Sequence, residues 1–450
     1  MTESNLNSDL LEKVIGLTKR RGFIFPSADI YGGFRSAYDF GPLGAALLRN
    51  IKAAWWKSMV QLRSDILGLD SAIMAPPAVF AASGHLETFT DPLVDCRQCK
   101  ERWRQDKIGG VCPKCGSTDL TQSRDFNLMF KTQAGPVEGS GADAYLRPET
   151  AQGIFTNFAN VLNTSRKSPP FGIAQIGKSF RNEITPQNFI FRTREFEQME
   201  MEFFVSPTSA EHWYHYWVDT RLQWYVDLGI PRESLRLNVH APSNLAHYSL
   251  GTTDIEFLFP WGFDEIEGVS NRGDYDLTQH SKHSGADLTY FDPHTKERYT
   301  PYVIEPAAGV ARVLLALLLS AYHEDVVAEK PRTVLSLAPA LSPYQVAVLP
   351  VSNKPELITM AERVLSALRP HFMCDTDITG SIGKRYRRQD EIGTPYCITV
   401  DFESLEDGMV TVRDRDTTKQ VRTPEGFMPT YIQTGVSYDE VMYNAPESSA

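Results

Sequence analysis

The segment GKSFRNEITPQNFIFRTREFEQMEMEFF (residues 177–204) places many opposed charges between two apolar, strand-like ends. Its arginines and glutamates are Arg181, Glu183, Arg192, Arg194, Glu195, Glu197, Glu200 and Glu202. We expect two antiparallel strands anchored at Phe180 and Phe191 and joined by the loop NEITPQN. The four-residue spacing of Arg192, Phe196 and Glu200 predicts that these three side chains share one strand face.

An arginine, an aromatic ring and a carboxylate on one sheet face suit a nucleotide beside a cationic group. A guanidinium is always charged and grips two phosphate oxygens at once, and the ring of Phe196 offers a flat face to a base. A solvent-exposed strand pair with surface salt bridges explains this segment alone equally well. Other segments must therefore decide between the two interpretations.

Three further segments carry carboxylates and arginines beside small residues: YLRPETAQG (145–153), GFDEIEGVSNRGDYDL (262–277) and YVIEPAAGVARVLLALL (302–318). Their chemistry-bearing residues are Glu149 in the first, Glu265, Glu267 and Arg272 in the second, and Glu305, Gly309 and Arg312 in the third. The second segment is predicted to be turn-rich and suits magnesium and polyphosphate. Together the segments predict a site in which arginines hold ATP phosphates and glutamates hold a small ammonium group.

The cysteines point to a metal rather than to disulfides. CRQCK and GVCPKCG supply two C-x2-C pairs, Cys96 with Cys99 and Cys112 with Cys115. Two such turns complete a tetrahedron around zinc, and four thiolates leave no open position for catalysis. We therefore expect a structural Zn²⁺ that pins a small ribbon at about residues 94–120. A redox C-x-x-C motif and four free thiols are the weaker alternatives.

Composition and hydropathy set the remaining limits. The chain has 450 residues, of which 42% are hydrophobic and 22% charged, which is typical of a globular protein with two or three domains. The apolar run around residues 313–319 is too short to cross a bilayer. The N-terminal sequence predicts no signal peptide, a cytoplasmic location and no membrane partner. A net charge of −11 does not exclude nucleic acid, because local basic patches decide such binding.

Secondary-structure patterns divide the chain near SLAPALSPYQVAVLPV (336–351). Upstream, helices are expected at 9–21, 43–67 and 207–228, strands or strand–loop units at 145–160, 171–181 and 189–205, alternation at 235–262, and a strand followed by a helix at 302–322. Downstream, strands at 345–351, 372–375 and 396–400, helices at 355–368 and from 381, and a hairpin at 408–422 predict a small α/β domain. The predicted domains are therefore 1–338 and 343–450.

At this point the residues resemble the class II aminoacyl-tRNA synthetases, and specifically the glycyl-tRNA synthetases of the dimeric, single-subunit type. The resemblance covers essentially the whole chain. It rests on YDFGPLGAALLRNIKAAWW (38–56) for motif 1, FRNE and FRTREFEQME (180–183 and 191–200) for motif 2, and EPAAGVARVLLALL (305–318) for motif 3. LRPETAQG (146–153), EFEQMEMEFF (195–204) and SNRGDYDLTQH (270–280) narrow it to the glycine enzymes. GSIGKRYRRQDEIGTPYCITVD (380–401) resembles their anticodon-binding domain.

The resemblance implies the fold, the reaction and the partners. The fold would be an α+β class II catalytic core, an antiparallel sheet flanked by helices, with the zinc-ribbon insertion and a C-terminal α/β anticodon-binding domain. The reaction would attach glycine to tRNA(Gly) through a glycyl-adenylate, using ATP with Mg²⁺. A homodimer would form through the motif 1 helix, which has an apolar face. The basic residues Lys384, Arg385, Arg387 and Arg388 would contact the anticodon arm, although a solvated helix face explains them too.

Motif matching also implies roles for single residues. Arg181 would contact the ATP α-phosphate and Arg312 the γ-phosphate, as the two catalytic residues, while Glu183 would meet the adenine amino group and Phe196 stack on the base. The rest of the ATP set is Asn182, Phe191, Arg192, Thr193, Arg194, Glu195, Glu265, Ile266, Gly309, Val310 and Ala311. Of these, Glu265 and Ile266 would lie beside ATP or its magnesium. The glycine set is Glu149, Glu200 and Glu305 as the acidic pocket, with Arg104, Phe196, Glu197, Gln198, Met199, Pro306, Ala307, Ala308 and Gly309. The family often has serine where this chain has Ala307, which puts a hydroxyl contact to glycine in doubt.

Three other interpretations remain. A class II synthetase for threonine, proline or histidine is the nearest, but a threonine enzyme would need a catalytic zinc with an open position. A non-catalytic paralogue usually lacks the arginines of motifs 2 and 3, whereas Arg181, Arg192 and Arg312 are present. A zinc-binding nucleic-acid module would explain the cysteines and leave the arginines and glutamates unexplained.

Overall fold

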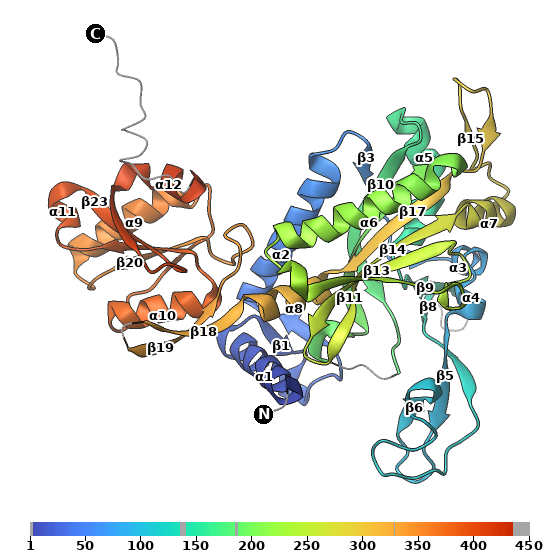
Figure 1. Ribbon diagram of the computed structural model, residues 1–450, viewed down its shortest axis with the longest axis horizontal. Helices are drawn as coiled ribbons and strands as arrows, with labels where there is room; N and C mark the ends of the chain where they lie inside the picture. The colour runs from blue at the N-terminus through green and yellow to red at the C-terminus, as the bar shows by residue number, and fades with distance from the viewer. Residues whose placement is uncertain (1–2, 136–140, 185–187, 328, 435–450) are drawn as a thin grey trace. The chain divides into compact units, whose positions relative to one another are not determined.

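The computed structural model describes residues 3–135, 141–184, 188–327 and 329–434. The chain divides into two compact units (Figure 1). The first comprises Met1–Phe25, Phe40–Ile51 and Leu317–Ala450, and the second comprises Pro26–Asp39 and Lys52–Ala316. This division differs from the predicted one because N-terminal segments group with the downstream part, so the ranges 1–338 and 343–450 stay a prediction.

A seven-stranded sheet organises the second unit. Its strand order is β12 (Leu235–Val239), β13 (Gly251–Phe259), β14 (Gly262–Gly273), β17 (Tyr302–Gly309), β11 (Glu195–Val205), β10 (Phe171–Phe180) and β3 (Ile66–Gly68). Every neighbouring pair is antiparallel except β10 and β3, which are parallel. The expected antiparallel sheet is thus present, with one parallel strand at its edge.

Side chains of β11 alternate between the two faces of this sheet, and a helix covers the apolar residues on each face. On one face, Phe155 and Phe158 of α5 (Ala151–Ser165) pack with Phe171 and Phe204. On the other, α6 (Ala210–Asp227) runs alongside β17 and β14 (Figure 1) and brings two tryptophans against Phe203. The face of β11 that carries Phe204 also carries Glu200 and Glu202, so two carboxylates point toward a helix-covered interior.

Several expected elements differ from the structure. The stretch predicted as strand at 145–160 is mostly α5, whose Ile154, Phe155 and Phe158 follow helical spacing. The helix expected at 43–67 is α2 (Pro42–Trp56) extended by a π-helical turn to Gln61, because β3 must begin at Ile66. The segment 262–277, predicted to be turn-rich, is the long strand β14 followed by α7 (Tyr275–Ser284).

The remaining elements are short or peripheral. The helices are α1 (Glu3–Arg21), α3 (Pro77–Ala82), α4 (His85–Thr88) and α8 (Val310–Ala321). The strands are β1 (Ile24–Pro26), β2 (Tyr38–Phe40), β4 (Met74–Ala75), β5 (Thr90–Asp95), β6 (Arg102–Arg104), β7 (Arg124–Asn127), β8 (Phe130–Ala134), β9 (Ala142–Leu146), β15 (Tyr290–Phe291), β16 (Arg298–Tyr299), β18 (Tyr322–Val327) and β19 (Lys330–Leu335). No helix among the described residues is long and apolar enough to span a membrane.

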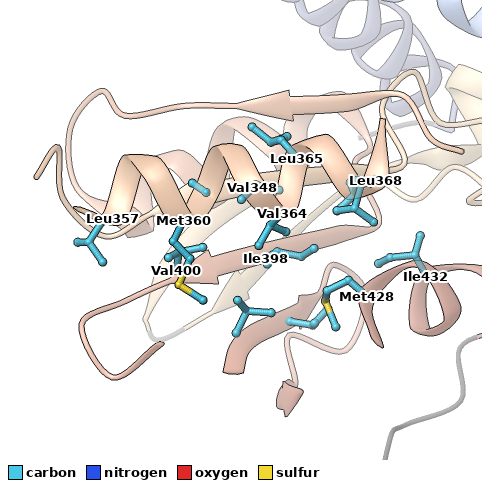
Figure 2. Packing of buried hydrophobic residues seen from close by; sticks show 14 residues of the cluster. Val348, Leu357, Met360, Val364, Leu365, Leu368, Ile398, Val400, Met428 and Ile432 are labelled. Atoms are coloured by element: carbon cyan, nitrogen blue, oxygen red, sulfur yellow. The ribbon is translucent and has the colours of Figure 1, made fainter. Parts of the chain in front are cut away.

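The downstream part of the first unit is the small α/β fold expected from sequence. Its sheet has the order β21 (Cys374–Thr376), β20 (Val346–Pro350), β22 (Tyr396–Val400), β23 (Met409–Asp414) and β24 (Gln420–Pro424). Its helices are α9 (Pro355–Leu368), α10 (Ile382–Ile392), α11 (Ser404–Asp407) and α12 (Met428–Thr434). Figure 2 shows the apolar side of α9 packed over Val348, Ile398 and Val400 of the sheet.

Candidate functional site

A cavity of about 280 Å³ in the second unit is bordered by four neighbouring strands and by the start of α8. Sixteen of the residues predicted for the site line it: Glu149, Arg181, Glu183, Phe191, Arg192, Thr193, Phe196, Gln198, Glu200, Glu265, Glu305, Ala307, Ala308, Gly309, Ala311 and Arg312. They come from four segments that are distant in sequence, at 149, 181–200, 265 and 305–312. The motif residues therefore converge on one cavity, as the sequence analysis expected.

Strand register explains both the convergence and the empty space. Glu200 of β11 pairs with Ala307 of β17, which pairs in turn with Gly268 of β14. The next row joins Gln198 to Gly309. Alanine and glycine at these positions leave room above the sheet, so the flanking charged side chains can meet a ligand there. The small residues of motif 3 are thus a spatial requirement of the cavity.

Arginines and aromatic rings form one part of the lining. The Arg181 guanidinium lies 5.3 Å from the Phe196 ring centroid, and its Nε donates to the Pro148 carbonyl at 3.0 Å. Arg312 lies 4.4 Å from the Phe191 ring centroid, and its Nη1 is 3.1 Å from a carboxylate oxygen of Glu265. Among the described residues Arg181 forms no ion pair, so its charge is available to an anion.

Carboxylates form the other part. Gln152 donates to Glu149 at 2.9 Å, and the Nε2 atom of His85 is 3.4 Å from the other Glu149 oxygen. The Thr150 hydroxyl donates to Glu200, and Arg272 donates to Glu305 at 2.5 Å. Each carboxylate that faces the cavity is therefore held by a neighbouring donor, which fixes its direction.

These carboxyl groups differ in their affinity for a proton. Burial raises the pKa of Glu200 to about 8, and the nearby Glu305 and Glu149 carboxyls add to the effect. Burial also raises the pKa of Glu305 to about 7, with Arg272 acting against it. Burial opposes ionisation of Glu149 too, but His85 and other partners outweigh it and lower its pKa. Glu149 is thus the member that stays ionised most readily.

Several lining residues were missed by sequence reasoning, among them Ile190, His240, Tyr248, Thr252, Asp254 and Ser270. The Tyr248 ring lies 3.8 Å from the Arg272 guanidinium. His240 is 2.7 Å from Asp254, whose pKa is raised to about 6 by burial first and by Glu265 second. Thr252 and Asp254 reach the cavity through the pairing of β13 with β14, which no local motif encodes, whereas Ser270 opens the segment SNRGDYDLTQH, whose family match could have marked it.

The residues predicted for the site that do not line the cavity are Arg104, Asn182, Arg194, Glu195, Glu197, Met199, Ile266, Pro306 and Val310. Met199 and Ile266 are fully buried. Glu197 pairs with Lys52 at 2.8 Å, and Glu195 pairs with Lys178 at 2.6 Å. Arg104 is 3.0 Å from Asp91 and 2.9 Å from Asp106, so its charge is already compensated away from the cavity.

The predicted strand pair also needs correction at one end. Phe191 lies in a 3-10 turn (Phe189–Phe191), and Arg192 precedes β11, which begins at Glu195. Phe196 and Glu200 do share a face of β11, but Arg192 reaches the cavity from the turn. Positive backbone φ angles at Asn188 and Phe189 form this turn, which a strand pattern does not predict.

A second cavity, of about 690 Å³, lies beside the first, and cations outnumber the carboxylates Glu101 and Glu183 in its lining. Its cationic lining consists of Arg35, Lys100, Arg102, Arg124 and Arg194, and Glu183 lines both cavities. Arg102 and Arg124 pair with Asp95 at 3.1 Å and 3.0 Å, which leaves an excess of positive charge. The predicted ATP-site residues Asn182 and Arg194 belong to this second cavity.

The four clustered cysteines meet at the tip of the β6–β5–β7 sheet. Their sulfur atoms all lie within 4.8 Å of one another, with 3.6 Å between Cys96 and Cys115 and 3.5 Å between Cys99 and Cys112. Four sulfurs about 2.3 Å from a zinc ion would stand roughly 3.8 Å apart in a tetrahedron. The donor set and its spacing therefore fit zinc.

Only part of the basic cluster predicted on α10 is exposed at the surface. Arg385 is 3% exposed and donates to the backbone carbonyls of Pro350, Asp377 and Gly380. Arg388 pairs with Asp377, and Arg387 donates to the Val327 carbonyl. Lys384 is exposed. That Arg385 contacts tRNA stays a prediction, and its buried guanidinium, which donates to three backbone carbonyls, gives it no support.

Family models match two parts of the chain: "tRNA synthetase class II core domain (G, H, P, S and T)" at residues 130–321 and "Anticodon binding domain" at residues 345–434. Among solved structures, the chain is similar to the prolyl-tRNA synthetase of Giardia lamblia in complex with prolyl-adenylate. The TM-score is 0.67 at 14% identity, over 95% of this chain and 75% of that one. The prolyl-tRNA synthetase of Cryptosporidium parvum gives a TM-score of 0.64 at 14% identity, over 93% and 74%. These structures share the fold.

Curated relatives with higher identity carry one name, "Glycine--tRNA ligase". The protein of Mycolicibacterium vanbaalenii is 53% identical over 95% of this chain and 98% of its own length. That of Bifidobacterium longum is 53% identical over 94% and 92%, and that of Geobacillus thermodenitrificans is 51% identical over 97% and 100%. The chain therefore belongs to the glycine–tRNA ligase family of class II aminoacyl-tRNA synthetases, enzymes that use ATP to attach glycine to tRNA.

Proposed function

We propose that glycine is activated in the cavity lined by Arg181, Phe196, Arg312 and the three carboxylates Glu149, Glu200 and Glu305. A carboxylate oxygen of glycine would attack the α-phosphorus of ATP, the bond to the β-phosphate would break, and pyrophosphate would leave. The 3′-terminal ribose hydroxyl of tRNA(Gly) would then attack the glycyl-adenylate and release AMP. The observation that carries the proposal is the meeting of free arginine charge and three carboxylates in one cavity.

The arginine side suits ATP. Phosphoryl transfer of this kind needs positioning and charge neutralisation more than a protein nucleophile. Arg181 would hold the α-phosphate, Phe196 would stack on adenine, and Arg312 would hold the γ-phosphate. The Glu265 carboxylate lies beside Arg312 and is partly exposed, as an oxygen ligand of magnesium must be. Mg²⁺ bound there would neutralise phosphate charge.

The carboxylate side suits a small ammonium group. Glycine offers no side chain to grip, and one methylene in an apolar pocket discriminates by only about 1–3 kcal/mol. Crowded carboxylates would instead bind the ammonium and leave no room for an added methyl group. The methyl side chain of Ala307 offers no hydroxyl, so the carboxylates would carry recognition without that contact.

The glycine pocket is tested by replacing Glu149, its most readily ionised carboxylate, with glutamine. We expect the KM for glycine in ATP–pyrophosphate exchange to rise roughly 10- to 100-fold, because a hydrogen bond between charged groups is lost. The KM for ATP should change little. Glu87→Gln, an exposed carboxylate on the neighbouring helix α4, is the matched control and should leave both constants unchanged. An unchanged KM for glycine in Glu149→Gln would refute the pocket assignment.

We infer that the four clustered cysteines hold a structural Zn²⁺. The ion would fix the tip of the β6–β5–β7 ribbon and would take no part in glycine activation. Metal analysis of the purified chain should give about one zinc per chain, as expected for a closed four-thiolate site. Cys115→Ser should lower this content strongly, whereas Cys374→Ser should not. Equal zinc content in both variants would contradict the assignment.

The second, basic cavity is our proposed location for the acceptor end of tRNA. Its cations suit backbone phosphates, and Glu183 connects it to the activation site. We keep Lys384, Arg387 and Arg388 as the candidate contacts to the anticodon arm. A cytoplasmic location is proposed because the relatives are translation enzymes.

We also propose a homodimer, as the resemblance to the dimeric type implies. The apolar face of α2 supplies less support than the sequence suggested. Leu47, Ile51 and Trp55 are already buried within the chain itself. The exposed side chains of Ile30, Tyr31 and Phe34 offer another apolar surface for a second copy. Sedimentation velocity of the purified chain measures the oligomeric state directly, and a monomer at micromolar concentration would exclude the homodimer.

A further inference from the structure

Glu202 is a buried carboxyl group to which neither motif matching nor the activation site assigns a role. It follows Glu200 by two residues on β11, so the two side chains share one face of the strand. Its relative exposure is 0%, and it does not line the cavity. Among the described residues neither of its carboxyl oxygens has a hydrogen-bond partner.

The two nearest acidic neighbours of Glu202 are both lining residues of the cavity. Oxygen atoms of Glu200, Glu202 and Glu305 all lie within 4.8 Å of one another. Three ionised carboxylates at this separation in a dry interior would repel strongly. At least one of them must therefore be protonated, or a cation must enter.

The charged groups around Glu202 do not compensate a negative charge on its carboxyl group. The nearest cation is Arg272 of β14, but its Nε and Nη2 atoms donate to Asp276 of α7 at 2.7 and 2.9 Å, and its Nη1 atom donates to Glu305. The residue of β10 that pairs with Glu202 is Ile173, which is apolar. The Thr150 hydroxyl donates its hydrogen bond to Glu200 and not to Glu202. Within the part of the chain that the structure describes, Glu202 is the member of the cluster that has no donor of its own.

We propose that Glu202 is a protonated positioning residue beneath the glycine pocket, whose O–H group donates to Glu200 or Glu305 and holds that carboxylate toward the ammonium of glycine. Burial, followed by the effect of Glu305, raises the pKa of Glu202 well above its ordinary value, which agrees with this state. The inference rests on the proposed glycine pocket and adds a residue beneath it.

Two substitutions of Glu202 test whether it acts as a neutral hydrogen-bond donor or as a charged carboxylate. Glu202→Gln keeps the shape, the neutrality and an N–H donor, so the KM for glycine should stay within about threefold of the wild-type value. Glu202→Leu removes the donor, so this KM should rise roughly 10- to 100-fold, while the KM for ATP is unchanged. Glu256→Gln, a buried carboxylate on the neighbouring strand β13, is the matched control with no expected change.

The pH dependence and the infrared spectrum test whether Glu202 is neutral in the folded protein. The pKa values of about 7 for Glu305 and about 8 for Glu200 predict that the KM for glycine falls as the pH rises from 6 to 8.5, because ionised carboxylates bind the ammonium. Glu202→Gln should keep this profile, since Glu202 carries its proton throughout. At pH 9, where Glu200 and Glu305 are mostly ionised, infrared spectra should show a protonated-carboxyl C=O stretch in the wild type that Glu202→Gln lacks.

Three outcomes would overturn the proposal. An equal loss in Glu202→Gln and Glu202→Leu would mean that an ionised carboxylate is required. A wild-type KM in Glu202→Leu would mean that no positioning occurs, and the absence of the infrared band would mean that no proton is present, even if Glu202→Leu fails to fold. Failure of the glycine pocket itself would appear separately, as an unchanged KM in Glu149→Gln.

Discussion

Replacing Arg181 with alanine is expected to lower the kcat of glycine-dependent ATP–pyrophosphate exchange by on the order of 10²–10³-fold. Arg181 is the cavity arginine whose charge no described carboxylate compensates, and its guanidinium lies 5.3 Å from Phe196, the proposed adenine platform. Charge builds up at the α-phosphate as the glycine oxygen approaches. A donor fixed in advance stabilises that charge without reorganising, so its loss acts on the transition state.

Arg298→Ala is the matched control for this experiment. Arg298 also lies over a phenylalanine ring, at 5.9 Å from the Phe291 centroid, and pairs with Asp287 at 3.0 Å, but it sits on the β15–β16 hairpin outside the cavity. Its removal should leave the exchange rate unchanged. The assignment of Arg181 to the α-phosphate of ATP would be contradicted if Arg181→Ala kept its kcat and showed only a higher KM for glycine.

Much of this arrangement was predictable because it depends on local patterns. Alternation marked β10 and β11, and the change from YVIEP to VARVLLALL marked the passage from β17 to α8 at Gly309. The downstream domain followed from alternating strand and helix patterns, and α9 has the predicted bounds Pro355–Leu368. Hydrophobic periodicity reports what each segment buries, so it predicts elements of this kind well.

The rest depended on long-range pairing, which periodicity does not encode. His85 lies in a short helix and carries no motif by itself, yet it is the partner of Glu149. Tyr248 lies in the loop before β13 and lines the site beside Arg272, 3.8 Å from its guanidinium. Arg385 has the charge pattern of a surface cluster, but its guanidinium donates to three backbone carbonyls. A charge in the sequence does not reveal whether its partner is solvent, a ligand or the backbone.

Replacing Arg272 with methionine should have the largest effect on stability. Arg272 is 2% exposed, donates twice to Asp276 and once to Glu305, and stacks on Tyr248 at 3.8 Å. Methionine fills similar volume but leaves two buried carboxylates without their cation. We expect the free energy of unfolding to fall by about 3–5 kcal/mol, as measured in urea by tryptophan fluorescence.

Arg221→Met separates the loss of a buried ion pair from the loss of the glycine pocket. Arg221 is also buried, donates to Glu267 at 2.6 and 3.1 Å and lies 4.3 Å from the Trp224 ring centroid, but on the opposite face of the sheet. Both variants should lose similar stability. Arg272→Met alone should also raise the KM for glycine, because Glu305 loses the donor that orients it.

The pH dependence of the Arg272→Met effect follows from Glu305. Its pKa in the folded state is about 7, above the ordinary value of 4.5, so its contribution to stability is present at low pH and is lost as the pH rises through the folded pKa. Removing Arg272 takes away the group that opposes this shift, so the folded pKa rises further. The difference in unfolding free energy between wild type and Arg272→Met should therefore be larger at pH 8 than at pH 6. A difference that does not change with pH would show that Arg272 stabilises the fold by packing on Tyr248 and Phe155, and not by compensating Glu305.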